Sequence, residues 1–213
     1  MLPIPHGACG AAGDFLIGIA PGGSAIYMEH RRKGGRAMRA VILAGGFGTR
    51  IAEESHLRPK PMVEIGGMPI LWHIMKIFGA QGVTDFVICC GYKGDQIKEY
   101  FSHYALHRGD VTFDFRAGGR MEVHTRQTEP WRVTLADTGL TTMTGGRLKR
   151  AAPYLQGERF FLTYGDGVAD VDLAGLLRCH LTKGKLATMT VVRPEGRFGT
   201  AELRDGLVTA FRE

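Results

Sequence analysis

Hydrophobic and polar positions alternate along this chain in a pattern that predicts an α/β fold. Short apolar runs of strand length recur from residue 39 onward, and segments with helical periodicity lie between them. The expected strands are Arg39–Ala44, Asp85–Cys90, Phe160–Tyr164 and Leu186–Val192. The expected helices are Pro69–Gly79, Asp95–His103 and Asp172–Leu181, the last capped by Asp172. Because strands and helices alternate, we expect a mostly parallel sheet flanked by helices.

Shorter strand-like runs predict small antiparallel flaps beside that sheet. The first flap is expected from Val111–Phe115, Met121–Thr125 and Arg132–Leu135. Gly118-Gly119 lies between the first two of these runs and is a hairpin signal. A second hairpin is expected from Ala201–Leu203 and Leu207–Phe211, joined across Asp205-Gly206.

Residues 1–37 differ from the rest of the chain. They are rich in Gly, Ala and Pro and show weak periodicity. Their positive charge follows the apolar part, which is the reverse of the order in a signal peptide. We therefore expect Met38 to be the natural start, residues 1–37 to be a non-native or disordered extension, and residues 38–213 to be the single folded domain.

Composition narrows the function classes. The 213 residues are 44% hydrophobic and 23% charged, which is ordinary for a globular protein with one large domain. The four cysteines show no C-x-x-C pair and no metal-ligand spacing. Cys89 and Cys90 end an apolar run, so we expect these two to be buried free thiols, which fits a reducing cytoplasm. No apolar stretch approaches the ~18 residues that cross a bilayer. The net charge of +6 lacks the aromatic-interleaved basic stripe that binds nucleic acid. We therefore expect a cytoplasmic protein with no membrane or nucleic-acid partner and a small anionic substrate.

Candidate chemistry begins directly after the first expected strand, in a glycine-rich loop. Gly45, Gly46 and Gly48 carry no side chains that would keep an anion away from backbone N–H groups. Arg50 then supplies a planar guanidinium that can hold two phosphate oxygens, and Lys60 supplies a point charge between two prolines. The loop matches neither the dinucleotide fingerprint G-x-G-x-x-G nor the phosphate loop G-x-x-x-x-G-K-[ST]. It is typical of a polyphosphate site or, alternatively, of a plain tight turn.

A second cluster follows the expected strand that ends at Tyr164. Asp166 lies between two glycines, at the strand end where open α/β sheets bind their ligands. A carboxylate there suits Mg²⁺ held mostly by substrate oxygens, and the alternative is an ordinary turn residue. Upstream, Thr144–Arg150 opens an expected helix, and Arg147 could face an anion or a base edge there. The alternative for Arg147 is a solvated basic helix face.

These motifs, in this order, resemble the signature of sugar-phosphate nucleotidyltransferases. The matching stretches are residues 43–50 (LAGGFGTR), 59–75 (PKPMVEIGGMPILWHIM), 129–131 (EPW), 144–150 (TGGRLKR) and 163–170 (TYGDGVAD). The resemblance covers Met38 to Glu213 and is greatest for the branch that acts on CTP and glucose 1-phosphate. It implies a Rossmann-like fold of the nucleotide-diphospho-sugar transferase type and a Mg²⁺-assisted reaction that gives CDP-glucose and pyrophosphate. It also implies a homo-oligomer when full length, and a role in polysaccharide biosynthesis.

The resemblance also assigns residues to the site. It implies Arg50, Lys60 and Asp166 as catalytic residues, with Asp166 as the metal ligand. The residues implied in substrate and nucleotide binding are Leu43, Ala44, Gly45, Gly46, Phe47, Gly48, Thr49, Arg50, Lys60, Thr142, Arg147 and Gly165. Two alternatives stay open: a sister enzyme that uses UTP or dTTP, and a non-catalytic module that binds a nucleotide or sugar phosphate.

The chain departs from this family at its end. After the position of Glu213, the family continues with Lys-Pro, sugar-binding residues and a second metal-binding aspartate. We therefore expect an incomplete domain, with weakened nucleotide binding and little or no turnover in this polypeptide.

Overall fold

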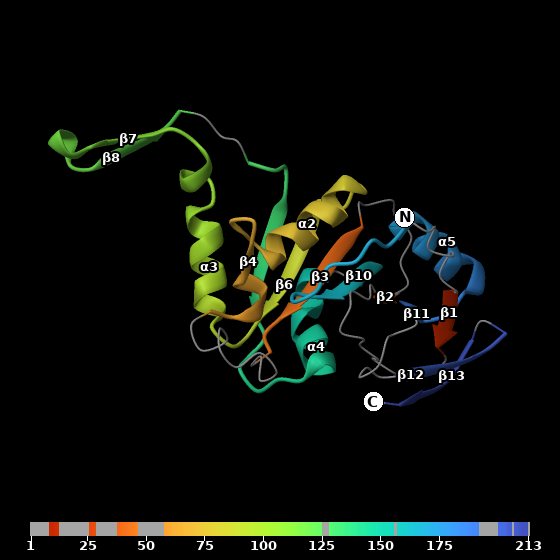
Figure 1. The fold of residues 1–213 in the computed structure, drawn as a ribbon. Helices are drawn as coiled ribbons and strands as arrows, with labels where there is room; N and C mark the ends of the chain where they lie inside the picture. Colours follow the sequence, from red (N-terminus) through yellow and green to blue (C-terminus); the bar gives the residue numbers. More distant parts are fainter. Residues whose placement is uncertain are drawn as a thin grey trace.

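A nine-stranded sheet forms the centre of the molecule (Figure 1). The computed structural model describes residues 9–12, 26–28, 38–46, 58–124, 128–155, 157–191, 200–205 and 207–212. The strand order is β12-β13-β1-β11-β2-β10-β3-β6-β9. The bounds in chain order are β1 (Cys9–Ala12), β2 (Ile26–Met28), β3 (Arg39–Ala44), β6 (Asp85–Cys90), β9 (Arg132–Asp137), β10 (Phe160–Tyr164), β11 (Ala187–Thr190), β12 (Thr200–Arg204) and β13 (Leu207–Arg212).

Four neighbouring strands of this sheet, β10, β3, β6 and β9, run parallel. Every residue of β3 is buried, and so is every residue of β6 after the first. Parallel strands covered on both faces read as continuous apolar runs, which is why the sequence predicted β3, β6 and β10 with their observed bounds. The expected α/β class with a mostly parallel central sheet is confirmed.

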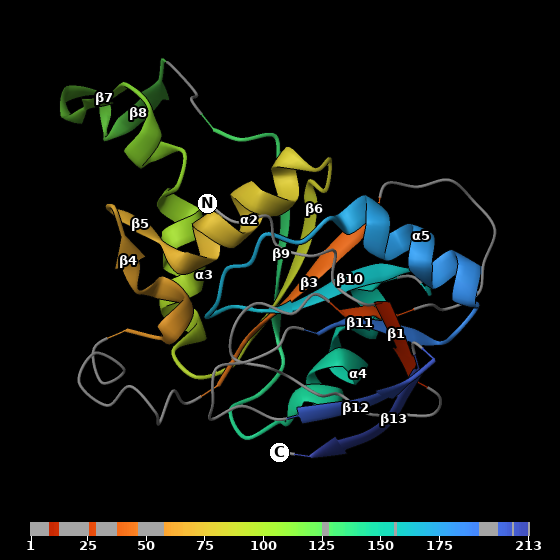
Figure 2. The same cartoon turned by 45° about the vertical axis from the view of Figure 1, so that its right-hand side comes forward.

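Helices cover both faces of the sheet. The helices are α2 (Ile70–Ala80), α3 (Gly94–His103), α4 (Thr144–Leu155) and α5 (Leu173–Lys183). Helices α2, α3 and α5 pack on the face that carries Ala40, Ile42 and Phe86, whereas α4 packs on the face of Val41 and Leu43. Figure 2 shows α2 and α5 on one side of the strands and α4 on the other. None of the helices among the described residues combines the length and apolar composition needed to span a bilayer.

The helix ends agree with the sequence to within a few residues. The side chain of Asp172 accepts a hydrogen bond of 2.8 Å from the backbone N–H of Gly175, so Asp172 caps α5 as expected. The segment Thr144–Arg150 opens α4, also as expected. The strand predicted as Leu186–Val192 is β11, which is shorter at both ends than the prediction and pairs in antiparallel fashion with β1 and β2.

The expected three-stranded flap is wrong in one respect. Strands β7 (Val111–Asp114) and β8 (Arg120–Val123) form a hairpin, and Gly118 and Gly119 have positive φ of 75° and 82°. Figure 1 shows this hairpin projecting away from the body. The third run, β9, instead pairs in parallel with β6 as the edge of the central sheet. Hydrophobic and polar residues alternate along β9 because only some of its side chains are buried. Such alternation does not distinguish a parallel edge strand from an antiparallel strand.

Two further antiparallel pairs are β12–β13 and β4–β5. Strands β12 and β13 pair in antiparallel fashion, which confirms the second expected hairpin. A further two-stranded sheet, β4 (Glu64–Ile65) with β5 (Met68–Pro69), precedes α2 and was not expected. Single 3-10 turns are η1 (Lys60–Met62), η2 (Leu106–Arg108) and η3 (Phe115–Ala117).

The first 37 residues contribute two strands. Strand β2 lies between β10 and β11 and is antiparallel to both, and β1 pairs with β11 and β13. These strands are three and four residues long and lack an apolar repeat, which is why the sequence pattern did not indicate them. The other residues of this segment lie outside the described ranges. That residues 1–37 are a non-native extension stays a prediction.

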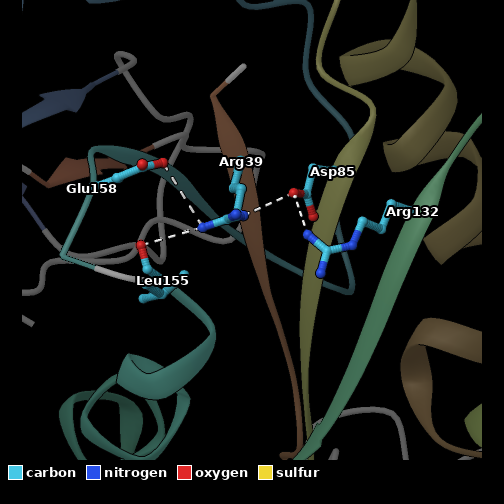
Figure 3. Close-up of polar contacts among 5 residues, drawn as sticks. All are labelled: Arg39, Asp85, Arg132, Leu155 and Glu158. Atoms are coloured by element: carbon cyan, nitrogen blue, oxygen red, sulfur yellow. Dashed lines mark hydrogen bonds and ion pairs between the residues drawn. The ribbon is translucent and has the colours of Figure 1, made fainter. Parts of the chain in front are cut away.

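A row of charged side chains forms ion pairs across the amino ends of three parallel strands (Figure 3). Arg39, Asp85 and Arg132 are direct cross-strand neighbours at the first positions of β3, β6 and β9. The carboxylate oxygen Oδ2 of Asp85 lies 2.8 Å from Arg39 Nε and 3.1 Å from Arg132 Nη1. Arg39 Nη1 also donates to the carbonyl of Leu155, at the end of α4, at 3.3 Å and lies 3.9 Å from Glu158. This cluster thus stabilises the end of the sheet that lies away from the carboxyl ends of the same strands.

Replacing Arg39 should destabilise the fold more than replacing Arg132. The Arg39 side chain is 7% exposed and that of Arg132 is 70% exposed, although both contact the same carboxylate. We expect Arg39→Met to lower the free energy of unfolding by about 2–3 kcal/mol, because Asp85 keeps one partner and the loss stays below the ~3–5 kcal/mol of a fully orphaned buried charge. Arg132→Met should cost less than about 1 kcal/mol. Urea denaturation of both variants measures the difference, and equal losses would contradict this account.

Candidate functional site

A cavity of about 260 Å³ lies beyond the carboxyl ends of β3 and β10. This is the edge at which open α/β sheets place their ligands. Its walls come from the loop after β3, from η1, from the loop between β9 and α4, and from the end of β10. The lining residues are Leu43, Ala44, Gly45, Gly46, Lys60, Pro61, Leu140, Thr141, Thr142, Met143, Thr144, Arg147, Tyr164 and Asp166.

The structure brings most of the described predicted site residues to this one cavity. Those that line it are Leu43, Ala44, Gly45, Gly46, Lys60, Thr142, Arg147 and Asp166. Gly165 lies beside it, and its backbone N–H donates to the carbonyl of Leu43 at 2.9 Å. A Cβ at Gly165 would lie 3.0 Å from Pro61, so a side chain there would be crowded against the cavity wall. Phe47, Gly48, Thr49 and Arg50 lie outside the described residues.

Lys60 and Asp166 form an ion pair within the cavity. Lys60 Nζ lies 3.8 Å from Asp166 Oδ2, and the two side chains are 18% and 43% exposed. Lys60 is held by η1, whose Pro61 and Met62 are buried, while Asp166 follows β10 at the sheet edge. The pair therefore places one cation and one carboxylate at the strand ends, next to the backbone of Gly45 and Gly46.

The donor set fits a divalent cation that is shared with a substrate. Among the described residues no group of three or more His, Cys, Asp or Glu side chains could hold a metal ion by itself. A single exposed carboxylate, Asp166, is nevertheless what a Mg²⁺ ion needs when phosphates and water supply its other ligands. Asp166 is the described residue that could hold such an ion in this cavity.

Arg147 lies on the cavity floor and is not on a solvated helix face. It is 6% exposed, and its guanidinium donates to the main-chain carbonyls of Gly45, Cys90 and Gly139, which lie at or just beyond the carboxyl ends of β3, β6 and β9. Burial in this position lowers the pKa of Arg147. The alternative of a solvated basic face is therefore wrong for this residue, although it holds for the exposed Lys149 two positions later.

Arg150 makes hydrogen bonds to the loop between β9 and α4, which forms another wall of the cavity. Its Nη1 donates to Thr142 Oγ1 and to the carbonyl of Thr138, both at 2.7 Å. Thr142 is thus held in place at the cavity surface. The sequence did not single out Arg150 for this role, because its partners precede it in the loop that leads into α4.

Several lining residues were also missed. Tyr164, Thr144, Leu140, Thr141, Met143 and Pro61 line the cavity without having been singled out. The strand-end rule could have found Tyr164, which is the last residue of β10. The hydroxyls of Tyr164 and Thr144 lie 3.4 Å apart, so they close one side of the cavity together.

Comparison with known proteins places the chain in a family. The model of the nucleotidyl transferase family matches residues 39–213. The chain belongs to the nucleotidyl transferase family. The parallel sheet with helices on both faces is thus the fold of a nucleotidyltransferase.

Relatives of this nucleotidyltransferase include glucose-1-phosphate cytidylyltransferases. The protein of that name from Salmonella typhimurium is 59% identical over 177 residues, which are 83% of this chain and 68% of the relative. A probable glucose-1-phosphate cytidylyltransferase from Bacillus subtilis is 46% identical over 176 residues, again 83% of this chain and 68% of the relative.

Solved structures agree on the fold. The structure of HddC from Yersinia pseudotuberculosis complexed with GMP-PN has a TM-score of 0.50 at 27% identity, over 68% of this nucleotidyltransferase and 54% of that chain. The UDP-glucose pyrophosphorylase from Acinetobacter baumannii has a TM-score of 0.53 at 15% identity, over 70% of this chain and 54% of that chain. The chain thus spans about half the length of these structural neighbours.

Proposed function

We propose that this nucleotidyltransferase moves a cytidylyl group from CTP to α-D-glucose 1-phosphate. The observation that carries the proposal is the 59% identity to a named glucose-1-phosphate cytidylyltransferase over 83% of the chain. The cavity supports it, because it combines bare backbone at Gly45 and Gly46 with a lysine and a carboxylate. An oxygen of the sugar phosphate forms a bond to the α-phosphorus of CTP, the bond to the β-phosphate oxygen breaks, and pyrophosphate leaves with CDP-glucose as the other product.

The chemical difficulty of this transfer is charge. The attacking phosphate is anionic at neutral pH, so no strong base is needed, but several negative groups must come together. The protein therefore contributes positioning and charge neutralisation. Backbone N–H groups from Gly45 to Gly48 and the side chain of Arg50 hold the β- and γ-phosphates. Lys60 bridges the α-phosphate and the sugar phosphate.

Asp166 is the proposed metal-holding residue. A bound Mg²⁺ would neutralise phosphate charge and polarise the α-phosphate. The 3.8 Å separation from Lys60 supports a shared role, since both groups then face the same phosphate. Lys60 also keeps the carboxylate in place before the substrate arrives.

The nucleotide is proposed to lie in the same cavity, against Thr142, Arg147 and Gly165 and next to Leu43 and Ala44 at the end of β3. Arg150 orients Thr142 through the 2.7 Å hydrogen bond, so the threonine hydroxyl is held at a fixed position.

The alternatives have less support. A relative that is named a guanylyltransferase is 28% identical, and the structural neighbour named for UDP-glucose is 15% identical, against 59% for the cytidylyltransferase. The relatives reported above are named as cytidylyltransferases, which favours an enzyme over a non-catalytic module.

We also propose that copies of this protein associate with one another. The β7–β8 hairpin carries Phe113, Phe115 and Met121, which are 53%, 81% and 48% exposed. A lone two-stranded hairpin is marginally stable in water, so a second copy that covers this apolar surface would stabilise it. We therefore propose a homo-oligomer when the protein is full length. From the family resemblance we further propose that it works in the cytoplasm and supplies CDP-glucose for polysaccharide biosynthesis.

Pyrophosphate release tests the proposed reaction. The folded chain is incubated with Mg²⁺, glucose 1-phosphate and, in parallel, CTP, UTP or dTTP. We expect slow release with CTP that depends on glucose 1-phosphate and exceeds release with the other two nucleotides. Faster release with UTP or dTTP would overturn the choice of nucleotide.

A further inference from the structure

The segment 129–131 (EPW), which carries part of the family resemblance, does not line the cavity. It lies directly before β9, at the amino end of the parallel sheet, whereas the cavity lies beyond the carboxyl ends. Its contacts are at the root of the β7–β8 hairpin, which we call the arm (residues 111–123). Figures 1 and 2 both show the arm beyond the end of α3, away from the central sheet. The chain enters the arm from α3 and η2 and returns from it to Glu129 and β9.

Glu129 is a nearly buried carboxylate that contacts three side chains at this root. Its side chain is 12% exposed. Tyr104, which directly follows α3, donates a hydrogen bond from its hydroxyl to Glu129 Oε2. Glu129 Oε1 lies 3.4 Å from Lys76 Nζ on α2 and 3.9 Å from Arg108 Nη2 in η2. Glu129 is thus bonded both to the body of the molecule and to the stem through which the chain enters the arm.

The polar groups of the root are in the protonation states that these bonds require. Burial alone would raise the pKa of Glu129, but the hydrogen bond from Tyr104 and the charges of Arg108 and Lys76 lower it below its ordinary value. Burial, together with the hydrogen bond to Glu129, raises the pKa of the Tyr104 hydroxyl, so this hydroxyl keeps its proton and donates it. The same hydroxyl oxygen accepts a hydrogen bond of 2.8 Å from Trp72 Nε1. Two hydrogen bonds in series therefore link α2 to Glu129 through Tyr104.

Aromatic rings pack around these polar groups. Trp131 stacks on Tyr104 with the ring centroids 6.3 Å apart, and it meets the edge of Phe86 at 5.9 Å. Phe86 is fully buried in β6, so Trp131 anchors the returning stem to the central sheet. The guanidinium carbon of Arg108 lies 5.4 Å from the ring centroid of Tyr104 and 5.8 Å from that of Trp72. The root is therefore a packed cluster of side chains and not a single ion pair.

These contacts join the two stems of the arm to each other and to the body. The cluster takes two residues from each part, namely the outgoing stem (Tyr104, Arg108), the returning stem (Glu129, Trp131) and helix α2 (Trp72, Lys76). A hairpin that is fixed at one stem can swing about that stem. A hairpin that is fixed at both stems cannot swing unless the bonds between them break, and Glu129 makes the direct bonds between the two stems of this arm.

We infer that Glu129 locks the arm in one direction by joining both of its stems to α2. The apolar side chains of the arm are thereby presented to a partner before contact, so association does not have to order the arm. The identity of that partner, a second copy of this chain, rests on the self-association proposed above. Glu129 is a positioning residue for the arm, and the lock gives the segment 129–131 a use outside the cavity.

Relaxation of the backbone ¹⁵N nuclei tests the lock. All samples carry Phe115→Ser, which removes a side chain of the arm that is 81% exposed, so that a second copy does not hold the arm. We expect order parameters of about 0.85 for the arm amides when Glu129 is present and below about 0.6 in Glu129→Ala. Amides of β3 and β6 should stay near about 0.85 in every sample. The control is Glu99→Gln, which removes an exposed carboxylate from α3 and should leave the arm unchanged.

Two results of this measurement would overturn the inference. One is an arm that keeps its order in Glu129→Ala. The other is an equal loss of order in β3 and β6, because that would be a general destabilisation of the fold and not the release of one hairpin. If Glu129→Ala does not fold, Tyr104→Phe decides in the same way, since it keeps the ring and removes only the hydroxyl that bonds to Glu129 and Trp72.

Self-association of chains that keep Phe115 supplies a second readout. Sedimentation velocity over a range of concentrations compares the wild type with Glu129→Ala and Glu99→Gln. We expect the dissociation constant to rise at least about tenfold in Glu129→Ala, because a mobile arm must be ordered when it binds. Glu99→Gln should associate like the wild type. Equal association of Glu129→Ala and the wild type would contradict the use of the lock in association.

The lock and the proposed self-association fail in different ways. If the wild type stays monomeric at every concentration, the self-association fails, while relaxation still decides the lock. If the wild type associates and the arm keeps its order in Glu129→Ala, the self-association stands and the lock fails.

Discussion

Replacing Lys60 with alanine should lower the rate of CTP-dependent pyrophosphate release at least a hundredfold while the chain stays folded. Lys60 is the described lysine of the cavity, and its Nζ lies 3.8 Å from Asp166. Loss of one preorganised charge contact in such a site typically costs about 2.7–4 kcal/mol of transition-state stabilisation, or about 10²–10³ in rate. The measurement is a coupled pyrophosphate assay at saturating CTP and glucose 1-phosphate.

A matched control separates this effect from a general loss of positive charge. Lys185 is exposed and lies outside the cavity, so Lys185→Ala should keep the wild-type rate. Thermal unfolding of Lys60→Ala should stay close to that of the wild type, because an ion pair with a carboxylate that is 43% exposed contributes little stability. If Lys60→Ala kept more than half of the activity, the role of Lys60 would be wrong.

Replacing Asp166 with asparagine should have an effect of similar size through a different cause. Asparagine keeps the shape of the side chain but loses the charge with which Asp166 would hold Mg²⁺. We expect turnover to fall a hundredfold or more, on the order of the loss from removing one electrostatic contact. We also expect the Mg²⁺ concentration for half-maximal rate to rise. Both are measured in one series of pyrophosphate assays over increasing Mg²⁺.

Asp170 offers the control for this substitution. It is an exposed aspartate on the same loop, and it does not line the cavity. Asp170→Asn should therefore leave both the rate and the Mg²⁺ dependence unchanged. An Asp166→Asn variant with wild-type Mg²⁺ dependence would contradict the metal role, even if its rate were low.

The sequence predicted those parts of the fold that burial alone determines. Strands β3, β6 and β10 are covered on both faces, so each is a continuous apolar run with clear ends. Strand β9 is a partly exposed edge, and its alternating pattern fits an antiparallel flap as well as it fits a parallel edge. Strands β1 and β2 are too short to carry any period.

The site was predictable as a set of residues but not as a set of contacts. Lys60, Asp166 and the glycines after β3 were found because each follows or flanks a recognisable strand end. Arg147 was identified as a candidate, but its partners lie at or just beyond the ends of β3, β6 and β9, and no local pattern links them. Which oxygens a buried guanidinium reaches is decided by tertiary packing, and only the structure shows that Arg147 joins the end of β6 to the loops after β3 and β9.

Calorimetric titration of the folded chain with CTP, UTP and dTTP in the presence of Mg²⁺ tests the central claim most directly. It asks whether the cavity between β3, β10 and α4 is a site for a cytidine nucleotide, and it does not depend on turnover. The account predicts saturable binding of CTP, at least about tenfold tighter than UTP or dTTP, which corresponds to about 1.4 kcal/mol of discrimination. Equal affinity for the three nucleotides, or no binding of CTP by a folded sample, would contradict it.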